Sequence, residues 1–174
     1  MGEPRPAGSV SELMAMVDTG WQRLLQAIDR MGEDRLEEPL LPGGWSASDV
    51  LSHVRLYDAW LLGMLDRTCR EDQEPYRSFL TRPESLHERN RVHVERDRRL
   101  TPREARRGAL ETHAAMREVL ADIPDDRLSV LHTVDEDGFS PAPDGRALAW
   151  LIAVETHWHY SDHAAALNAL LESP

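Results

Sequence analysis

The 174-residue sequence contains no lysine and a single cysteine, Cys69. One cysteine cannot form an internal disulfide, and it cannot supply a redox pair or a multi-cysteine zinc site. We therefore expect a reducing, cytoplasmic location. Because lysine is absent, the chain has neither a phosphate-binding P-loop nor any mechanism that forms a Schiff base on lysine. All 20 basic residues are arginines.

Positively charged residues are also fewer than negatively charged ones. The sequence has 31 acidic residues and 20 arginines, so the formal net charge is −11. Because phosphate binding depends on clustered positive charge, we expect no nucleic-acid partner and no binding to an anionic membrane. No apolar run has the length of a transmembrane helix. Residues 1–8 lack the apolar segment of a signal peptide and are expected to form a flexible leader.

Apolar residues recur at the three- and four-residue spacing of amphipathic helices. The first predicted helix begins at a capping sequence whose first residue is Ser9. This helix is predicted to end at Gly32. The second begins at Ser46, with Asp49 as the reciprocal capping partner. The last helix is expected over about 146–171.

A third helical region covers about 84–120. The pair Thr101–Pro102 is typical of a helix start, so this region is predicted to be split or kinked there. A short strand over 129–134 would have no evident partner strand. These patterns predict an all-α protein, with one four-helix-bundle domain over residues 9–172.

Polar residues interrupt the apolar faces of two predicted helices. In the last helix, Glu155, His159 and His163 follow the aliphatic positions at steps of three or four, so they share one face. His53 lies within the apolar stripe of the second helix. Two histidines at i, i+4 and a third from a facing helix can bind one divalent metal ion and leave positions open. Core histidines that are only hydrogen bonded are the alternative.

Two segments carry a resemblance to a known family. They read GGWSASDVLSHVRLYDAW at 43–60 and IAVETHWHYSDH at 152–163. Together they resemble the DinB/YfiT-like superfamily, and within it the ClbS/DfsB-type four-helix-bundle proteins. Those proteins have a Gly-Trp-Ser motif at the start of the second helix, a histidine further inside it, and a histidine pair in the last helix. The resemblance implies that His53, His159 and His163 bind the metal.

The resemblance also implies a range of chemistry. Members of the superfamily resemble S-transferases that use mycothiol or bacillithiol, a mycothiol-dependent isomerase, and self-resistance proteins. For this chain it implies a divalent metal ion (Zn, Ni or Fe), with mycothiol or bacillithiol as the candidate co-substrate. The reaction expected is hydrolysis of, or thiol transfer to, an electrophilic small molecule, in detoxification or self-resistance. A non-catalytic bundle that only binds a small molecule is the alternative, and a homodimer scaffold is a third.

Further residues are assigned to the same site. Glu155 is the candidate catalytic carboxylate, and a role as metal ligand or as a partner that orients His159 stays open. Tyr57 and Trp60, one and two turns beyond His53, are core residues first and walls of a substrate pocket second. Asn90 resembles a third-helix position of the family and is assigned to substrate binding.

Other polar residues are expected to lie away from the site. His157 and Tyr160 point to other faces of the last helix, and His157 is predicted at the surface. The arginine-rich run 95–107 is interpreted as a solvated helix face paired with nearby acids. The alternative for this run is an anion-binding rim for an acidic thiol or a substrate carboxylate.

Overall fold

A computed structural model describes residues 7–69, 86–132 and 146–172, so most of the predicted leader lies outside the described residues. Within these residues the fold consists of six α-helices, a π-helical turn between the last two, two 3-10 turns and a two-stranded ladder. In chain order these elements are α1 (Val10–Met31), a 3-10 turn (Glu33–Arg35), α2 (Ala47–Cys69), α3 (Leu86–Asp97), α4 (Pro102–Ala121), a 3-10 turn (Asp125–Ser129), β1 (Leu131–His132), β2 (Arg146–Ala147), α5 (Leu148–Ala153), the π turn (Val154–Trp158) and α6 (His159–Glu172).

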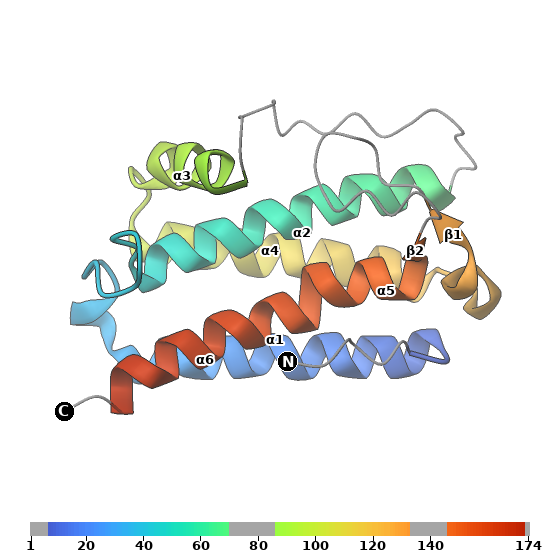
Figure 1. Cartoon of the computed structure of the whole chain (residues 1–174), viewed down its shortest axis with the longest axis horizontal. Coiled ribbons are helices and arrows are strands. Elements are labelled where there is room, and N and C mark those ends of the chain that lie inside the picture. Colours follow the sequence, from blue (N-terminus) through green and yellow to red (C-terminus); the bar gives the residue numbers. More distant parts are fainter. Residues whose placement is uncertain (1–6, 70–85, 133–145, 173–174) are drawn as a thin grey trace.

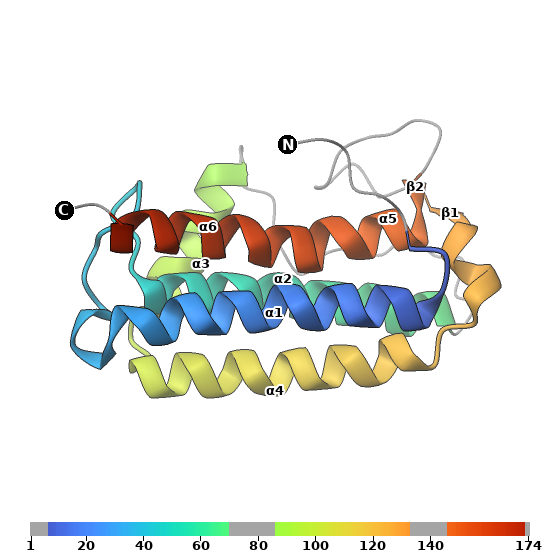
Figure 2. The same ribbon diagram turned by 90° about the horizontal axis from the view of Figure 1, so that it is seen from below.

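Four rods form the bundle: α1, α2, α4, and the continuous rod from α5 to α6 (Figures 1 and 2). Helices α2 and α4 run in one direction, whereas α1 and the last rod run in the other (Figure 1). Helix α3 lies outside the four rods and packs on α2. The predicted all-α four-helix bundle is confirmed, and the third helical region is split into α3 and α4.

The strand predicted over 129–134 does have a partner. Strand β1 pairs antiparallel with β2, and Leu131 lies opposite Ala147. The partner is only two residues long and directly precedes α5, so no alternating pattern marks it in the sequence. Among the residues that the structure describes, every helix is too short or too polar to cross a lipid bilayer.

The helix caps follow the sequence closely. Ser9 Oγ accepts a hydrogen bond from the Glu12 backbone N–H at 3.2 Å. The Glu12 carboxylate accepts from the Gly8 N–H, so only half of the reciprocal box forms there. Thr101 and Glu104 complete both halves of theirs. Helix α1 ends at Met31, and the C-cap residue Gly32 has a φ of +81°, a conformation that favours glycine.

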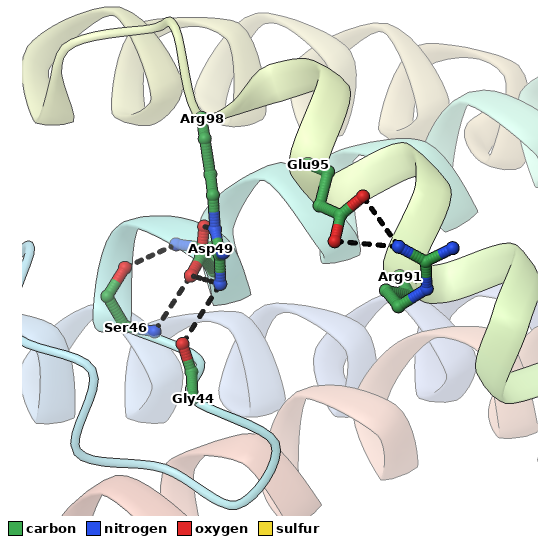
Figure 3. Close-up of polar contacts among 6 residues, drawn as sticks. All are labelled: Gly44, Ser46, Asp49, Arg91, Glu95 and Arg98. Carbon is green, nitrogen blue, oxygen red and sulfur yellow. Dashed lines mark hydrogen bonds and ion pairs between the residues drawn. The ribbon is translucent and has the colours of Figure 1, made fainter.

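The start of α2 is held by a polar cluster (Figure 3). Ser46 Oγ accepts from the Asp49 N–H at 3.1 Å, and the Asp49 carboxylate accepts from the Ser46 N–H at 3.0 Å. Arg98, just beyond α3, donates to the same carboxylate and to the Gly44 carbonyl. Asp49 therefore caps α2 and also ties the α3–α4 connection to the bundle.

Asp49→Ala is expected to lower the free energy of unfolding by about 1–3 kcal/mol, because it removes a cap and leaves Arg98 without its carboxylate. Urea denaturation followed by circular dichroism measures this. Arg91→Ala is the matched control, since Arg91 forms an ion pair with Glu95 at an exposed position (Figure 3). Exposed pairs contribute little, so this control should leave stability almost unchanged. Equal midpoints for the two variants would contradict the role given to Asp49.

The last rod changes its winding midway, at the π-helical turn Val154–Trp158. A π turn holds one extra residue, so the segment after it is rotated by about 100° relative to an unbroken α-helix. The buried stripe that begins at Leu148 and Ile152 therefore continues through Tyr160, Ala164 and Leu167.

This rotation corrects the predicted face of the last helix. The sequence places His159, His163 and Ala166 on the same stripe as Leu148. In the structure Ala166 is exposed, and the two histidines are only partly buried. They lie beside the core stripe, on the side that faces His53 of α2, because the π turn shifts the core positions by one residue.

Candidate metal centre

Three imidazoles from two helices meet between α2 and α6. His53 Nε2 lies 2.8 Å from His159 Nε2, and His163 Nε2 lies 3.0 Å from the same atom. One nitrogen from each ring lies within 4.8 Å of the other two. His159 and His163 are one helical turn apart, so the pair projects toward His53 from a single face of α6.

The surroundings keep these rings neutral. Burial lowers the pKa of His53 well below its ordinary value, and repulsion from His159 and His163 adds to this effect. Burial, with repulsion from His163, lowers the pKa of His159 to about 3, although the Glu155 backbone acts in the opposite sense. Burial lowers the pKa of His163 to about 4. At neutral pH all three imidazoles therefore have a lone pair available for a cation.

The donor set fits a divalent metal ion better than a purely hydrogen-bonded cluster. Each nitrogen of a neutral imidazole carries either one hydrogen or one lone pair. His159 Nε2 has two close nitrogen neighbours, so a hydrogen bond can satisfy its contact with only one of them. A cation accepts lone pairs from all three rings, and imidazole suits Zn, Ni and Fe.

Aromatic side chains surround the cluster. Trp45, at the loop before α2, meets His53 edge to face with ring centroids 5.0 Å apart. Tyr57 packs on both His53 and His159, with centroids 4.7 and 4.8 Å away. The Tyr57 hydroxyl donates to Asn90 Oδ1 of α3 at 2.8 Å. The structure thus places Tyr57 against the histidine cluster and Asn90 against the Tyr57 hydroxyl.

The remaining predicted site residues lie deeper in the bundle. Trp60 is buried, one turn beyond Tyr57 on α2. Glu155 is also buried, and its side chain does not belong to the cluster of close ligand atoms. Its charge acts on Tyr160, where it helps to raise the pKa of the phenol.

Two predictions about neighbours of the ligand pair need correction. His157, expected at the surface, is only 7% exposed, because the π turn carries its backbone against Gly20 of α1. Burial lowers the pKa of its imidazole. Tyr160 does point away from the cluster, as predicted, but it points into the core and is fully buried.

A buried polar group near the cluster was missed by the sequence analysis. Asp58 of α2 is fully buried and accepts a hydrogen bond from the Tyr160 hydroxyl at 2.5 Å. His113 of α4 lies 3.3 Å from that hydroxyl and 3.7 Å from the Asp58 carboxylate. Trp21 of α1 stacks on the His113 ring. A signal existed for His113, which occupies the apolar stripe of α4 between Ala109 and Met116.

The arginine-rich run 95–107 forms ion pairs with acids, which agrees with the interpretation as a solvated face. Five of its arginines have carboxylate partners: Arg96 with Asp97, Arg98 with Asp49, Arg103 with Glu33, Arg106 with Asp29, and Arg107 with Glu111. Most of these side chains are largely exposed, so each pair adds little to stability.

The sequence profile of the DinB superfamily matches residues 16–165. The chain belongs to the DinB superfamily. The three histidines and the motif around Trp45 all lie inside the matched range, and so does the π turn. The resemblance stated from the two sequence segments is therefore confirmed at the level of the superfamily.

Solved structures show the same fold at low sequence identity. The colibactin self-resistance protein ClbS, in complex with a dsDNA, has a TM-score of 0.77 and 14% identity over 97% of this chain and 98% of that chain. An uncharacterised protein from Escherichia coli UTI89 has a TM-score of 0.76 and 12% identity, covering 96% and 95% of the two chains. A mycothiol-dependent maleylpyruvate isomerase has a TM-score of 0.67 and 15% identity, covering 91% of this chain and 60% of its own. No curated protein sequence matches the chain.

The ClbS structure overturns one prediction. Net charge was taken to exclude a nucleic-acid partner, yet a protein with this DinB fold has been solved with dsDNA. That prediction is wrong as it was drawn. A net charge sums over the whole chain, whereas phosphate contacts depend on where individual cations lie. The run 95–107 concentrates arginines on one part of an acidic molecule.

Proposed function

We propose that this DinB-superfamily protein is a mononuclear metal-dependent enzyme. It would act on an electrophilic small molecule, by hydrolysis or by transfer of a low-molecular-weight thiol. The observation that carries the proposal is the convergence of His53, His159 and His163, with one nitrogen of each ring within 4.8 Å of the others. The fold shared with a mycothiol-dependent isomerase and with a self-resistance protein is consistent with a role on small molecules.

The metal would be Zn, Ni or Fe, held by the three imidazoles. A divalent ion with three protein ligands and open positions supplies Lewis acidity, which favours deprotonation of a water or a thiol. The three imidazoles are already neutral at pH 7, so they need not lose protons to bind the ion. Mycothiol or bacillithiol is the proposed thiol, because Cys69 is the only cysteine of the chain.

The residues around the cluster would shape the substrate site. Tyr57, fixed by its hydrogen bond to Asn90, forms one wall beside His53 and His159. Trp45 would form a second wall, through its edge-to-face contact with His53. Glu155 remains the proposed catalytic carboxylate, and Trp60 supports the wall from within α2. In thiol transfer, the sulfur would form a bond to the electrophilic carbon, the leaving group would depart with its electron pair, and the thiol proton would pass to a base.

Metal analysis of protein purified without a histidine tag tests this proposal first. We expect about one equivalent of Zn, Ni or Fe per chain by mass spectrometry, or reconstitution to that level after chelation. Protein that neither carries nor takes up a divalent metal would contradict the metal site. The loaded protein is then assayed with an aryl halide or an epoxide, in the presence and absence of mycothiol.

The assay separates catalysis from binding alone. Turnover that needs mycothiol supports thiol transfer, and turnover without it supports hydrolysis. If the electrophile is retained by the protein but no product forms, the non-catalytic binding protein is the better description. The chelator-treated protein is the control for the uncatalysed reaction.

A further inference from the structure

The buried group Asp58, Tyr160 and His113 has no place in the proposed chemistry. Asp58 and Tyr160 are fully buried, and His113 is 5% exposed. The Tyr160 hydroxyl donates to Asp58 Oδ1, so its oxygen can accept a hydrogen bond from His113 Nδ1. Trp21 covers the His113 ring at a centroid distance of 4.2 Å. None of these side chains belongs to the histidine cluster.

This group joins the two helices that carry the histidines. Tyr160 directly follows His159 on α6, and Asp58 lies five residues after His53 on α2. An α-helix rises about 1.5 Å per residue, so the Asp58–Tyr160 bond lies about 7.5 Å along α2 from His53. The side-chain contacts between α2 and α6 thus include one between His53 and His159 and one between Asp58 and Tyr160.

Burying these polar side chains costs free energy, so we expect them to have a specific structural role. A buried carboxylate loses its hydration, and burial raises the pKa of Asp58 despite its two hydrogen-bonding neighbours. Burial and the nearby Asp58 charge raise the pKa of the Tyr160 phenol as well. Apolar residues of similar size would fill the same space at lower cost. Buried polar pairs do, in some proteins, select one register over its neighbours.

The structural property that this hydrogen bond can set is the register of α6 relative to α2. The π turn already adds one residue to the helix, and a further slip of one residue would rotate His159 by about 100° away from α2. After a slip of one residue, Ala165 would replace Ala164 without loss, whereas Asn168 would replace Leu167, so the apolar contacts discriminate between these registers at only one of the two positions. The hydroxyl of Tyr160 can reach Asp58 in one register only, since neither neighbour, His159 or Ser161, carries a phenol.

We propose that Asp58 and Tyr160 are positioning residues for the histidine cluster: their buried hydrogen bond sets the rotation of α6 against α2, so that His159 and His163 face His53. The inference rests on the proposed metal site. His113 supports the bond from α4 by its contact with the Tyr160 hydroxyl. The hydroxyl contacts Asp58 and His113, and it would act on the histidines only through the rotation of α6.

The test compares metal affinity between Tyr160→Phe and the full-length parent protein. Phenylalanine keeps the ring that packs on Trp21 but removes the hydrogen bond. Affinities for Zn²⁺ and Co²⁺ are measured by competition with a chromophoric chelator, and the visible spectrum of bound Co²⁺ reports ligand geometry. Groups that hydrogen bond to metal ligands are worth about 10–100-fold in metal affinity. Tyr160 acts one step further out, through the rotation of α6, so we expect a loss at the lower end of this range, about tenfold, with an altered Co²⁺ spectrum.

Two further variants keep the inference falsifiable. Asp58→Asn retains an oxygen that accepts from Tyr160, so its affinity should stay within about threefold of the parent value. Leu167→Ala is the control for general loosening, because it opens the buried stripe of α6 without touching the polar group. It should lower the thermal midpoint but preserve the affinity and the Co²⁺ spectrum. Circular dichroism establishes that each variant is folded at the assay temperature.

The outcomes distinguish this inference from the proposed function. If the parent protein binds neither Zn²⁺ nor Co²⁺, the metal site fails and the inference fails with it. If the parent binds but Tyr160→Phe binds equally well, only the positioning role is overturned. A loss in Asp58→Asn equal to that in Tyr160→Phe would assign the effect to the carboxylate charge and would also overturn it. An equal loss in Leu167→Ala would do the same, because any loosening of α6 would then suffice.

Discussion

His159→Gln is expected to lose its stoichiometric metal while its helix content stays unchanged. His159 Nε2 is the central atom of the cluster, since it lies within 3.0 Å of the other two nitrogens. Contacts outside the ligand shell already account for about 10–100-fold in metal affinity, so loss of a ligand should cost about 100-fold or more. Metal content by mass spectrometry and affinity by chelator competition measure the loss, and far-ultraviolet circular dichroism measures the helix content.

His157→Gln is the matched control for that experiment. It removes the same ring two residues away, from a buried position whose two nitrogens lie outside the cluster. The control should keep its metal, whereas His53→Gln, a change on the other helix, should behave like His159→Gln. Retention of full affinity by His159→Gln would rule out the three-histidine site.

A second readout follows from linkage between binding and folding. A ligand that binds only the folded protein stabilises it by about 2.7 kcal/mol when its concentration is 100 times the dissociation constant. The parent protein should therefore melt at a higher temperature when Zn²⁺ is added, and His159→Gln should show almost no shift. An equal shift in both proteins would mean that the ion binds elsewhere.

The parts of this structure that the sequence predicts are those set by local chemistry. The start of α2 is fixed by the reciprocal bonds of Ser46 and Asp49, and the start of α4 by Thr101 and Glu104. Such caps depend on residues three positions apart, which a sequence displays directly. The i, i+4 spacing of His159 and His163 is equally local, so their proximity could be predicted from the sequence.

The π turn is the main feature that the sequence does not reveal. It is a single turn within a longer helix, and the residues 154–158 have no composition that separates it from an α-helix. Its consequences are nevertheless large. It moves Tyr160 into the core, brings His157 against α1, and leaves Ala166 in solvent. A prediction based on uniform helical spacing therefore found the histidine pair but extended its face to the wrong neighbours.

The sequence also does not predict which residues of different helices contact one another. Asp58 interrupts the apolar part of α2, and His113 interrupts the stripe of α4, so each was detectable as a polar residue in a core position. Helical periodicity gives the face of a residue but not its partner on another helix. The link between Asp58 and Tyr160 depends on how far α6 is rotated, and that rotation is set by the π turn.

Gly20→Ala is expected to destabilise the protein, although alanine is the better helix former. Gly20 lies within α1, and a β-carbon there would lie 2.7 Å from His157 Cα and 3.0 Å from the His157 carbonyl oxygen. Both are backbone atoms, so removing this overlap requires a shift of the π turn itself. Overpacking typically costs about 1–3 kcal/mol, whereas the helix propensity of alanine over glycine contributes about 0.8–1.0 kcal/mol. The cost equals this gain at its lower end and exceeds it over the rest of its range, so we expect a net loss of stability. Thermal and urea denaturation of the metal-free protein measure the change.

Gly108→Ala is the matched control, because Gly108 also lies inside a long helix, α4. The three atoms nearest to a β-carbon added there would all belong to the side chain of Arg55, at 3.1–3.2 Å, and a flexible side chain can move aside. The propensity gain should then dominate, and stability should stay level or rise by up to about 1 kcal/mol. Because His157 is two residues before His159, Gly20→Ala should also weaken metal binding, whereas Gly108→Ala should not. Equal stability and equal metal affinity in the two variants would mean that the close approach of α1 does not hold the π turn in place.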